Sequence, residues 1–360
     1  MATITIDGRA YPCTDGESAL DTLIEAGVDL PHSCKKGTCL TCVVRVKEGP
    51  VPPEAQAGLP ETLAADRHAL ACQLRPKDAI TIERVDDARL YVPATIDSIE
   101  PLAQRVVRVR LRTPAPFDYH AGQFVNLRRN DGLVRSYSLA SVPGEDAFLE
   151  LHVRRQDNGA MSTWLTHAAK PGDTIELQGP NGACFYVPGR PDQPLLLVGT
   201  GTGAAPLIGI LRDALAMAHT GPIVLYHGSR HPDGLYLNEA LGALALRHLN
   251  FRYVPCVSGP IHPRGTRPGR AHVVALKDHA SFKGVRVFAC GHPAMVHALR
   301  RQTYLAGASL GEIHGDPFDL RDLRRANRRA ARDQSNAAAS APAIGISAPA
   351  TASVVRRLDR

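Results

Sequence analysis

The sequence has no long hydrophobic run and no leader pattern. No apolar stretch among its 360 residues approaches the roughly 20 that a membrane-spanning helix needs. Residues 1–6 contain no basic segment followed by an apolar one, which is the pattern of a secretory signal peptide. We therefore expect a cytoplasmic protein that does not interact with membranes.

A basic, aromatic-rich patch is also missing. The net charge is +7, but Lys and Arg are scattered, and only 5% of the residues are aromatic. Because nucleic-acid binding relies on clustered basic residues, we expect no nucleic-acid partner. The charge is instead divided by region, with −4 over residues 1–90, +6 over 91–318 and +5 over 319–360. Such a division allows electrostatic steering between regions, although exposed charge of this size is common without a partner role.

Catalytic groups for a separate organic substrate are missing as well. We find no Ser/His/Asp arrangement and no paired carboxylates that indicate an active site of that kind. Substrate chemistry is therefore expected in a partner protein.

Cysteine is sparse, but four cysteines stand at metal-ligand spacing. Eight in total are too few for a disulfide-stabilised chain of this length. Cys34, Cys39 and Cys42 form a C-x4-C-x2-C array, and Cys72 follows in a separate segment. This spacing is typical of plant-type 2Fe-2S cluster ligation. A structural zinc site also takes four thiolates but usually pairs two C-x2-C motifs, so zinc is the alternative.

The hydrophobic pattern changes twice along the chain and predicts three domains and a tail. Residues 1–90 combine short strands with one helical stretch, which indicates a small α+β domain. Residues 91–190 contain short strands between Gly, Pro and Asp turns, with one helix near 162–169, which is typical of an antiparallel β-barrel. Residues 191–318 alternate apolar strands with helices, as in a parallel α/β sheet. Residues 319–360 form a basic, Ala-rich stretch that we expect to be disordered.

The N-terminal region resembles plant-type ferredoxin domains over residues 1 to about 88. The resemblance rests on Pro31 to Cys34 and on Gly37 to Cys39 within the cysteine array, and it implies a β-grasp-like fold around a 2Fe-2S cluster. One departure is Leu40, because this family usually has a small residue between the second and third cysteines. We expect Leu40 to exclude water from the cluster and to alter its potential.

A second group of motifs lies in the predicted barrel. An R-S-Y-S sequence on one strand is followed by a His and by a segment that opens a helix; these residues are Arg135, Ser136, Tyr137, Ser138, His152, Gly159, Ala160, Met161 and Ser162. The succession resembles the FAD-binding barrel of the ferredoxin–NADP reductase superfamily. The resemblance implies that all nine belong to the FAD site. It also implies that Arg135 holds a phosphate, Tyr137 stacks on the flavin, and Ser138 bonds near its reactive nitrogen.

A glycine-rich loop follows the first strand of the predicted parallel sheet. Gly199, Thr200, Gly201, Thr202 and Gly203 lead into a helix that contains Pro206, and they satisfy G-x-G-x-x-A in a strand–turn–helix context. This loop is similar to the nicotinamide-nucleotide site of the same superfamily.

Two residues after the second strand of that sheet bear on the choice of coenzyme. Ser229 and Arg230 fall where the 2'-position of the nucleotide is recognised, with Asp233 slightly later. Arg230 suits a 2'-phosphate and Asp233 a free ribose hydroxyl, so NADH and NADPH both stay open, with a slight preference for NADH.

Two further segments complete the predicted site. Cys290, Gly291 and Pro293 end the last clear strand, and Phe318 closes the third region. The resemblance implies that Cys290 positions the nicotinamide for hydride transfer and that Phe318 covers the flavin. An ordinary buried thiol and turn is the alternative for Cys290. Ser138, Cys290 and Phe318 are therefore the predicted catalytic residues.

The order ferredoxin, flavin barrel, nucleotide domain resembles the single-chain reductase components of ring-hydroxylating dioxygenases and di-iron monooxygenases. The resemblance implies that NADH or NADPH supplies a hydride, that FAD divides the electron pair, and that the cluster passes single electrons to a terminal oxygenase or another electron-acceptor protein. A CDP-6-deoxy-delta-3,4-glucoseen reductase, serving a deoxysugar dehydratase, fits the same pattern. A zinc-stabilised binding module without electron transfer is the alternative from another class.

Overall fold

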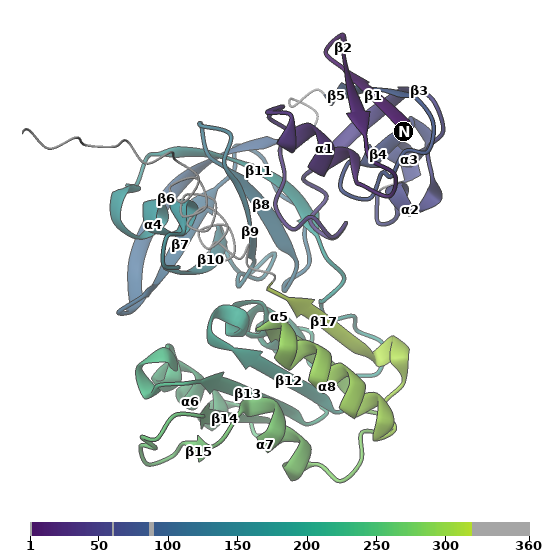
Figure 1. Cartoon of the computed structure of the whole chain (residues 1–360). Coiled ribbons are helices and arrows are strands. Elements are labelled where there is room, and N and C mark those ends of the chain that lie inside the picture. Colours follow the sequence, from purple (N-terminus) through teal and green to yellow (C-terminus); the bar gives the residue numbers. More distant parts are fainter. Residues whose placement is uncertain (1, 60, 86–89, 319–360) are drawn as a thin grey trace, which may run out of the picture. The chain divides into compact units, whose positions relative to one another are not determined.

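The computed structural model describes residues 2–59, 61–85 and 90–318. They form, in chain order, a five-stranded mixed sheet, a six-stranded antiparallel sheet and a six-stranded parallel sheet (Figure 1). The predicted succession of an α+β domain, an antiparallel barrel and a parallel α/β domain is therefore confirmed. The predicted tail lies outside the described residues. No helix in the described part of the chain is long and apolar enough to cross a membrane.

The first sheet has the strand order β2-β1-β5-β3-β4. β1 and β2 form a hairpin, and the turn residues Asp7 and Gly8 take the positive φ angles, 51° and 73°, that a tight hairpin turn requires. Helix α1 starts after Ser18, whose hydroxyl accepts a hydrogen bond from the Asp21 amide at 3.1 Å. The elements are β1 Ala2–Ile6, β2 Arg9–Cys13, α1 Ala19–Glu25, β3 Val43–Glu48, α2 Pro53–Gln56, α3 Glu61–Ala65, β4 His68–Leu70 and β5 Ile80–Arg84.

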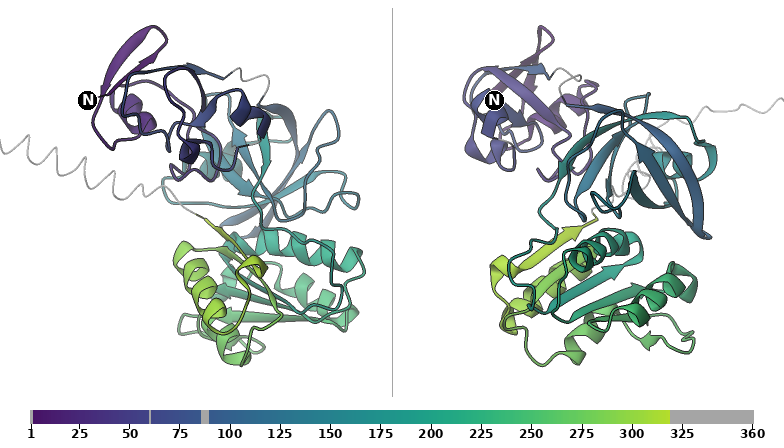
Figure 2. Two further views of the ribbon diagram at one scale, coloured as in Figure 1. Left: turned by 90° about the vertical axis from the view of Figure 1, so that its right-hand side faces the viewer. Right: turned by 180° about the vertical axis from the view of Figure 1, so that it is seen from behind.

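The second sheet, in the order β10-β7-β6-β11-β8-β9, closes as a barrel (Figure 2). An antiparallel bridge between Leu139, just after β9, and Leu151 in β10 makes the closure. In β7, Val109 and Leu111 are fully buried while the intervening Arg110 stays partly exposed, as the alternating sequence predicts. The strands are β6 Val92–Ala103, β7 Val106–Arg112, β8 Phe124–Arg128, β9 Val134–Ser138, β10 Leu149–Arg154 and β11 Thr174–Asn181.

The one helix predicted within the barrel region is present but differs in form. A single α-helical turn, α4 Ala160–Thr163, continues directly as a π-helical turn, η2 Trp164–Ala168. It therefore begins slightly earlier than the predicted 162–169. Met161 and Leu165 are both buried in the barrel core, so packing rather than helix propensity holds this short segment in place.

The third sheet, in the order β15-β14-β13-β12-β16-β17, is covered on both faces. Helices α5 and α6 pack with the odd-numbered core residues of β12, such as Leu195 and Leu197, and helices α7 and α8 pack with Leu196 and Val198. The elements are β12 Leu195–Thr200, η3 Gly201–Gly203, α5 Ala204–Ala216, β13 Ile223–Ser229, η4 Pro232–Gly234, α6 Asn238–Arg247, β14 Phe251–Val257, β15 Arg267–Pro268, α7 Ala271–Asp278, β16 Arg286–Gly291, α8 Pro293–Leu305, η5 Leu310–Glu312 and β17 Ile313–Pro317.

Candidate functional site

The cysteine loop between α1 and β3 folds so that backbone amides point at sulfur. The left-handed φ angles of Lys35 and Gly37, 57° and 80°, turn the chain around Cys34. The amides of Lys36 and Cys39 donate to the Cys34 sulfur at 3.3 and 3.4 Å. Amide donors of this kind stabilise a thiolate and are part of how proteins hold and tune metal-bound sulfur.

The four predicted ligand thiols are brought together as two pairs. Cys34 hydrogen-bonds with Cys39, which lowers the pKa of Cys34, and Cys42 hydrogen-bonds with Cys72, which lowers the pKa of Cys72. Two pairs of thiols fit a cluster of two irons with two protein ligands each. Within the described ranges, no group of three or more Cys, His, Asp or Glu side chains converges on a single-ion site. The paired donors therefore fit a 2Fe-2S cluster.

Asn126 connects the cysteine loop with the barrel. Its side chain is fully buried, and its amide nitrogen donates to the carbonyl oxygen of Cys39 at 2.6 Å. Its amide oxygen accepts from the hydroxyl of Ser136 at 2.7 Å. Sequence reasoning missed Asn126, because an Asn in a strand carries no signal until the partner segments are known.

The R-S-Y-S residues lie along β9 and face two ways. Ser136 is exposed, while Ser138 is buried and donates a hydrogen bond to a carboxylate oxygen of Asp316 at 3.1 Å. Burial raises the pKa of Tyr137, so its phenol stays protonated. Arg135 donates to the carbonyl oxygen of Val134 at 2.6 Å.

The other predicted barrel residues are held by local contacts. The Ser162 hydroxyl accepts from the Gln156 amide at 3.1 Å and donates to the Gly159 carbonyl at 3.2 Å. Met161 packs in the barrel core, so only its backbone is available to a cofactor. His152 points inward to other side chains, as described below.

The glycine-rich loop packs tightly against the end of β16. A Cβ atom on Gly203 would lie 2.2 Å from the carbonyl oxygen of Cys290, and one on Gly291 would lie 2.6 Å from the Thr200 hydroxyl. The Thr200 hydroxyl also accepts from the His292 amide at 2.9 Å. Both segments end neighbouring parallel strands, which is where α/β sheets bind nucleotides. The structure therefore brings together the two motifs that the sequence predicts for the nicotinamide nucleotide.

Three predicted catalytic residues meet where the barrel joins the parallel sheet. Cys290 and Asp316 are register partners on β16 and β17, and Asp316 accepts from Ser138 of the barrel. The Phe318 amide donates to the Gly291 carbonyl at 2.7 Å. Asp316 was not singled out from the sequence, although it lies two residues before the predicted Phe318.

Three matches to protein-family models follow the same order as the three sheets. A 2Fe-2S iron-sulfur cluster binding domain matches residues 3–77, an oxidoreductase FAD-binding domain residues 93–186, and an oxidoreductase NAD-binding domain residues 197–301. The chain belongs to the flavin iron–sulfur reductase components of oxygenase systems. It is thus an NAD(P)H-dependent oxidoreductase that transfers electrons through FAD to a 2Fe-2S cluster.

Relatives match almost the whole reductase. It is 38% identical to the reductase subunit of an aromatic O-demethylase from an Amycolatopsis species, covering 88% of this chain and 98% of the relative. It is 34% identical to the ferredoxin–NAD(P)+ reductase component of the naphthalene 1,2-dioxygenase system of Pseudomonas putida, covering 87% and 96%. The crystal structure of an Amycolatopsis cytochrome P450 reductase matches with a TM-score of 0.63 and 34% identity, covering 88% and 99%.

The end of β13 forms a basic hollow in the reductase. Arg230 lines it together with Ser258 and Arg270, which come from the segments after β14 and before α7, and the hollow measures about 560 Å³. The backbone amide of Ser258 donates to the Ser229 carbonyl at 2.9 Å, which joins the two loops. Arg270 is a candidate residue that sequence reasoning missed.

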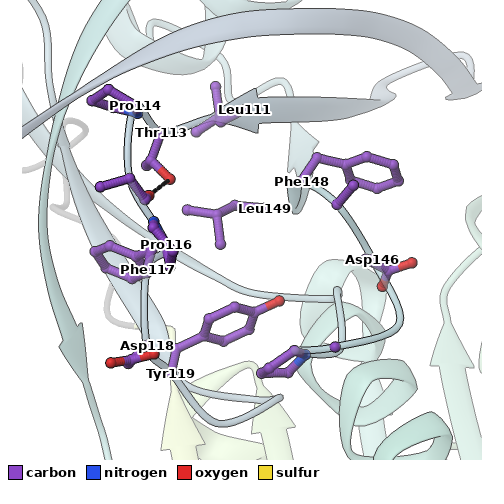
Figure 3. A pocket seen from close by; sticks show the side chains of 14 residues that line it. Leu111, Thr113, Pro114, Pro116, Phe117, Asp118, Tyr119, Asp146, Phe148 and Leu149 are labelled. Atoms are coloured by element: carbon purple, nitrogen blue, oxygen red, sulfur yellow. Dashed lines mark hydrogen bonds between the residues drawn. The ribbon is translucent and has the colours of Figure 1, made fainter.

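Another hollow, of about 460 Å³, contains none of the predicted site residues. It lies on the barrel between the 113–119 and 143–149 segments, and Figure 3 shows Phe117, Tyr119 and Phe148 lining it. Tyr119 donates to the Ser141 hydroxyl at 2.7 Å, and burial raises its pKa to about 12.

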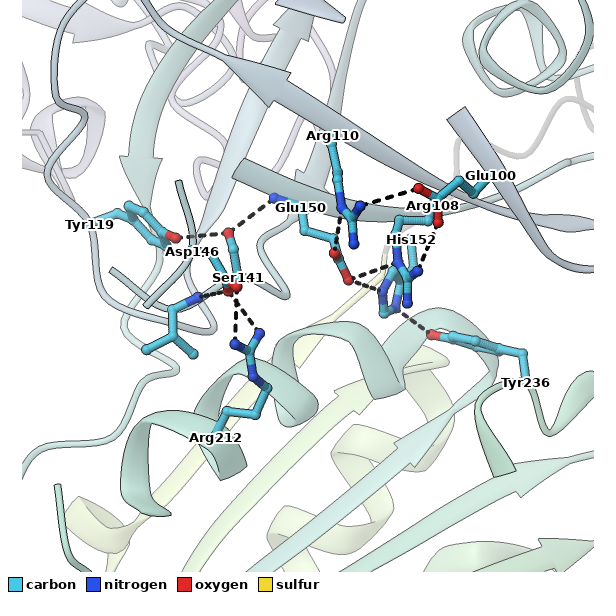
Figure 4. Close-up of polar contacts among 11 residues, drawn as sticks. Glu100, Arg108, Arg110, Tyr119, Ser141, Asp146, Glu150, His152, Arg212 and Tyr236 are labelled. Carbon is cyan, nitrogen blue, oxygen red and sulfur yellow. Dashed lines mark hydrogen bonds and ion pairs between the residues drawn. The ribbon is translucent and has the colours of Figure 1, made fainter. Parts of the chain in front are cut away.

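A polar network in the barrel reaches the nucleotide domain. Glu150 of β10 forms ion pairs with Arg108 and Arg110 at 3.2 and 3.3 Å. Glu150 also forms a hydrogen bond with Nε2 of His152. Nδ1 of His152 forms a hydrogen bond with the hydroxyl of Tyr236, which lies in the segment after η4 (Figure 4). The predicted FAD residue His152 therefore has its ring nitrogens in contact with protein groups on both sides.

Proposed function

We propose that this reductase takes hydride from NADH or NADPH between its barrel and its parallel sheet, and delivers single electrons from its cluster to a terminal oxygenase. The observation that carries the proposal is the convergence of Ser138, Cys290 and Phe318, which lie far apart in sequence but meet through Asp316 and Gly291. The proposed domains are 1–90 for the cluster, 91–190 for FAD and 191–318 for the nucleotide.

The residues of the chain would hold and orient the cofactors. Bound FAD supplies the step that no side chain can, because it takes up two electrons together and releases them singly. The guanidinium of Arg135 suits a phosphate, and the ring of Tyr137 suits a flavin face. Asp316 fixes the direction of the Ser138 hydroxyl, so that a flavin nitrogen would meet a positioned group.

Cys290 would act through its shape and not as a nucleophile. Its side chain is fully buried, and burial together with the neighbouring thiol of Cys184 raises its pKa well above the usual range. A thiol that stays protonated is a poor nucleophile. Its place beside the glycine-rich loop instead supports a role in packing against the nicotinamide ring.

Asn126 supports a short path for electrons between the proposed flavin site and the cluster. It contacts both Ser136, one of the proposed flavin residues, and the carbonyl of the proposed ligand Cys39. We propose that Cys34, Cys39, Cys42 and Cys72 hold the last carrier in the chain.

The proposed acceptor is a terminal oxygenase acting on an aromatic compound. The support comes from the relatives, whose names specify aromatic O-demethylase, naphthalene dioxygenase and phenol monooxygenase systems. The decisive experiment mixes the reduced protein with a purified cytochrome P450 demethylase, a ring-hydroxylating dioxygenase and a deoxysugar dehydratase. Reduction and turnover of one of the oxygenases supports the proposal, whereas turnover of the dehydratase alone would contradict it.

Replacement of one ligand tests the order of the carriers. In Cys72→Ser we expect NAD(P)H oxidation with ferricyanide, which accepts electrons from flavin, to persist, and reduction of cytochrome c to fall by more than about tenfold, since the cluster loses a thiolate ligand. Cys13→Ala, a buried cysteine outside the four, is the matched control and should keep both activities.

Two results would contradict this order. Equal loss of both activities in Cys72→Ser would mean that the cluster does not lie downstream of the flavin. A colourless wild-type protein that contains zinc would show instead that the four cysteines form a structural site.

A further inference from the structure

A buried chain of polar side chains links the barrel to the glycine-rich loop of the nucleotide domain. It consists of Glu150 and His152 on β10, Tyr236 after η4, and His227 near the end of β13, and we refer to these four residues as the buried chain. All are at most 9% exposed. Figure 4 shows the first three side chains in line, with the Tyr236 hydroxyl directed at the His152 ring.

The hydrogen bonds among Glu150, His152 and Tyr236 allow only one placement of the protons. Burial by itself raises the pKa of Glu150, but the hydrogen bond from His152, the charge of Arg108 and the hydrogen bond from Arg110 outweigh it and lower the pKa. The ionised carboxylate can only accept, so Nε2 of His152, 3.0 Å away, must carry a hydrogen. Burial lowers the pKa of His152, so the ring is neutral and its Nδ1 accepts from the Tyr236 hydroxyl at 3.2 Å.

The second half reaches the glycine-rich loop itself. Nε2 of His227 lies 3.1 Å from the carbonyl oxygen of Gly201, which can only accept, so this nitrogen also carries a hydrogen. Nδ1 of the same ring then accepts from the Tyr253 hydroxyl at 3.3 Å. Burial lowers the pKa of His227 to about 4, which keeps this arrangement at neutral pH.

Tyr236 lies between the two histidines and contacts both with its ring. The centroid distances are 5.3 Å to His152 and 5.5 Å to His227, with interplanar angles of 89° and 86°. Such edge-to-face contacts are directional. Tyr236 therefore ties a strand of the barrel to the histidine that holds the Gly201 carbonyl.

Another side chain of the same strand lies near the loop. A guanidinium nitrogen of Arg154, two residues beyond His152 on β10, lies 3.3 Å from where a Cβ of Gly201 would be. The loop in turn abuts the Cys290 carbonyl, so any shift of the loop relative to β10 would also displace the proposed nicotinamide site. Apolar side chains could fill the space that the buried chain takes. Hydrogen bonds are directional, however, and would fix one position of the glycine-rich loop relative to β10.

We propose that Tyr236 and His152 are positioning residues for hydride transfer. They hold the glycine-rich loop, and with it the bound nicotinamide nucleotide, in one register against the barrel that carries the flavin. The proposal rests on the proposed function of the two motifs. Hydride transfer is steep in donor–acceptor distance, so loss of the register would slow the chemical step more than it weakens nucleotide binding.

Tyr236→Phe removes the hydroxyl and keeps the ring with both of its edge contacts. In stopped-flow reduction of the FAD-loaded protein by NADH and by NADPH, we expect the limiting rate to fall at least about tenfold. The apparent dissociation constant of the nucleotide should change less than about twofold, because the buried chain contains no residue of the glycine-rich loop or of the basic hollow. The long-wavelength charge-transfer absorbance, which reports nicotinamide stacked on flavin, should decrease.

The matched control is Tyr226→Phe. Tyr226 is also fully buried in β13, and its hydroxyl donates to Asp278 at 3.0 Å on the opposite face of the sheet. The Tyr226→Phe variant should lose about as much stability as Tyr236→Phe, but it should keep the wild-type limiting rate of flavin reduction and the charge-transfer band. His152→Gln offers a donor for Glu150 and an acceptor for Tyr236, so it should recover most of the rate lost in His152→Leu.

Three results would overturn the proposal. Equal slowing in Tyr236→Phe and Tyr226→Phe would indicate a general loss of stability. A changed dissociation constant at an unchanged limiting rate would place Tyr236 in binding only. An His152→Gln rate as low as that of His152→Leu would exclude the hydrogen-bond chain. Failure of the proposed function is distinguishable, because the wild-type protein would then show no flavin reduction by either nucleotide.

Discussion

Leu40 shows at the residue scale why a small side chain is usual between the second and third cysteines. Its φ angle of 55° lies in the left-handed region, which costs most L-residues about 1–2 kcal/mol. The Leu40 side chain compensates by packing against the ferredoxin core, where it lies 3.8 Å from the place that a Cβ of Gly58 would take. The position is therefore tolerated because of packing, not because the backbone favours it.

We expect Leu40→Gly to raise the midpoint potential of the cluster by an amount on the order of tens of millivolts. The reduced cluster carries one more negative charge than the oxidised one, and water admitted by the smaller residue stabilises that charge. A redox titration followed by electron paramagnetic resonance measures the shift. Val28→Ala, which trims the same core away from the loop, should leave the potential unchanged. A lower or constant potential in Leu40→Gly would refute the water-exclusion role.

Single residues could be predicted only where a motif carries them. The four cysteines and the R-S-Y-S and glycine-rich sequences stand out by spacing. Asp316, Asn126 and Tyr236 do not, because each has its effect through a partner that is distant in sequence: Ser138, Cys39 and His152. Such pairings depend on how strands from different sheets meet, which no local pattern records.

At the scale of elements, the basic hollow combines one predicted and one missed segment. Arg230 ends a strand whose apolar run is plain from the sequence, whereas Arg270 caps α7, which was not predicted. Helix α7 is short and follows a stretch rich in Pro and Gly, so burial of Val274 and Ala275 against the sheet stabilises it more than propensity does. Strand β17 was missed for a similar reason, since its Gly and Pro are atypical of strands.

Arg230 and Arg270 line the same basic hollow, and from this we predict how each contributes to the use of NADPH and NADH. Arg230→Ala and Arg270→Ala should each raise KM for NADPH by roughly ten- to a hundredfold, the loss expected for a hydrogen bond between charged groups. KM for NADH should change by less than about twofold, because NADH lacks the 2'-phosphate. Steady-state kinetics with both nucleotides provides the measurement, and the exposed Arg264→Ala is the control. Equal effects on NADH and NADPH would assign the arginines to the shared part of the nucleotide.

At the scale of the whole molecule, the order of the three sheets follows from the changes in hydrophobic period along the chain. Each domain has its own core, so its fold class can be predicted without knowledge of the others. The interfaces are different, because their polar groups are buried only after the domains meet. The histidines show this most clearly, since nothing in the sequence separates His227, which is fully buried, from His262, which is exposed.

The buried histidines predict that the protein loses stability in mild acid. Burial lowers the pKa of the buried His152, His219 and His227, and partial burial lowers that of His272, His279 and His314. The unfolded chain then binds protons near pH 6.5 while the folded chain does not, so the free energy of unfolding falls as the pH drops below about 6.5. For His227, whose pKa falls to about 4, the loss reaches roughly 3 kcal/mol once the pH is below that value.

His227→Gln isolates this contribution, since the amide can still donate to the Gly201 carbonyl but does not titrate. Urea unfolding monitored by circular dichroism between pH 4 and pH 8 should show a shallower decline in the variant than in the wild type. The difference in slope between the two curves should vanish above about pH 7, where the histidine is neutral in both states. His262→Gln, an exposed position, should follow the wild-type curve. Parallel curves for wild type and His227→Gln would mean that acid acts through other groups, such as release of the cluster.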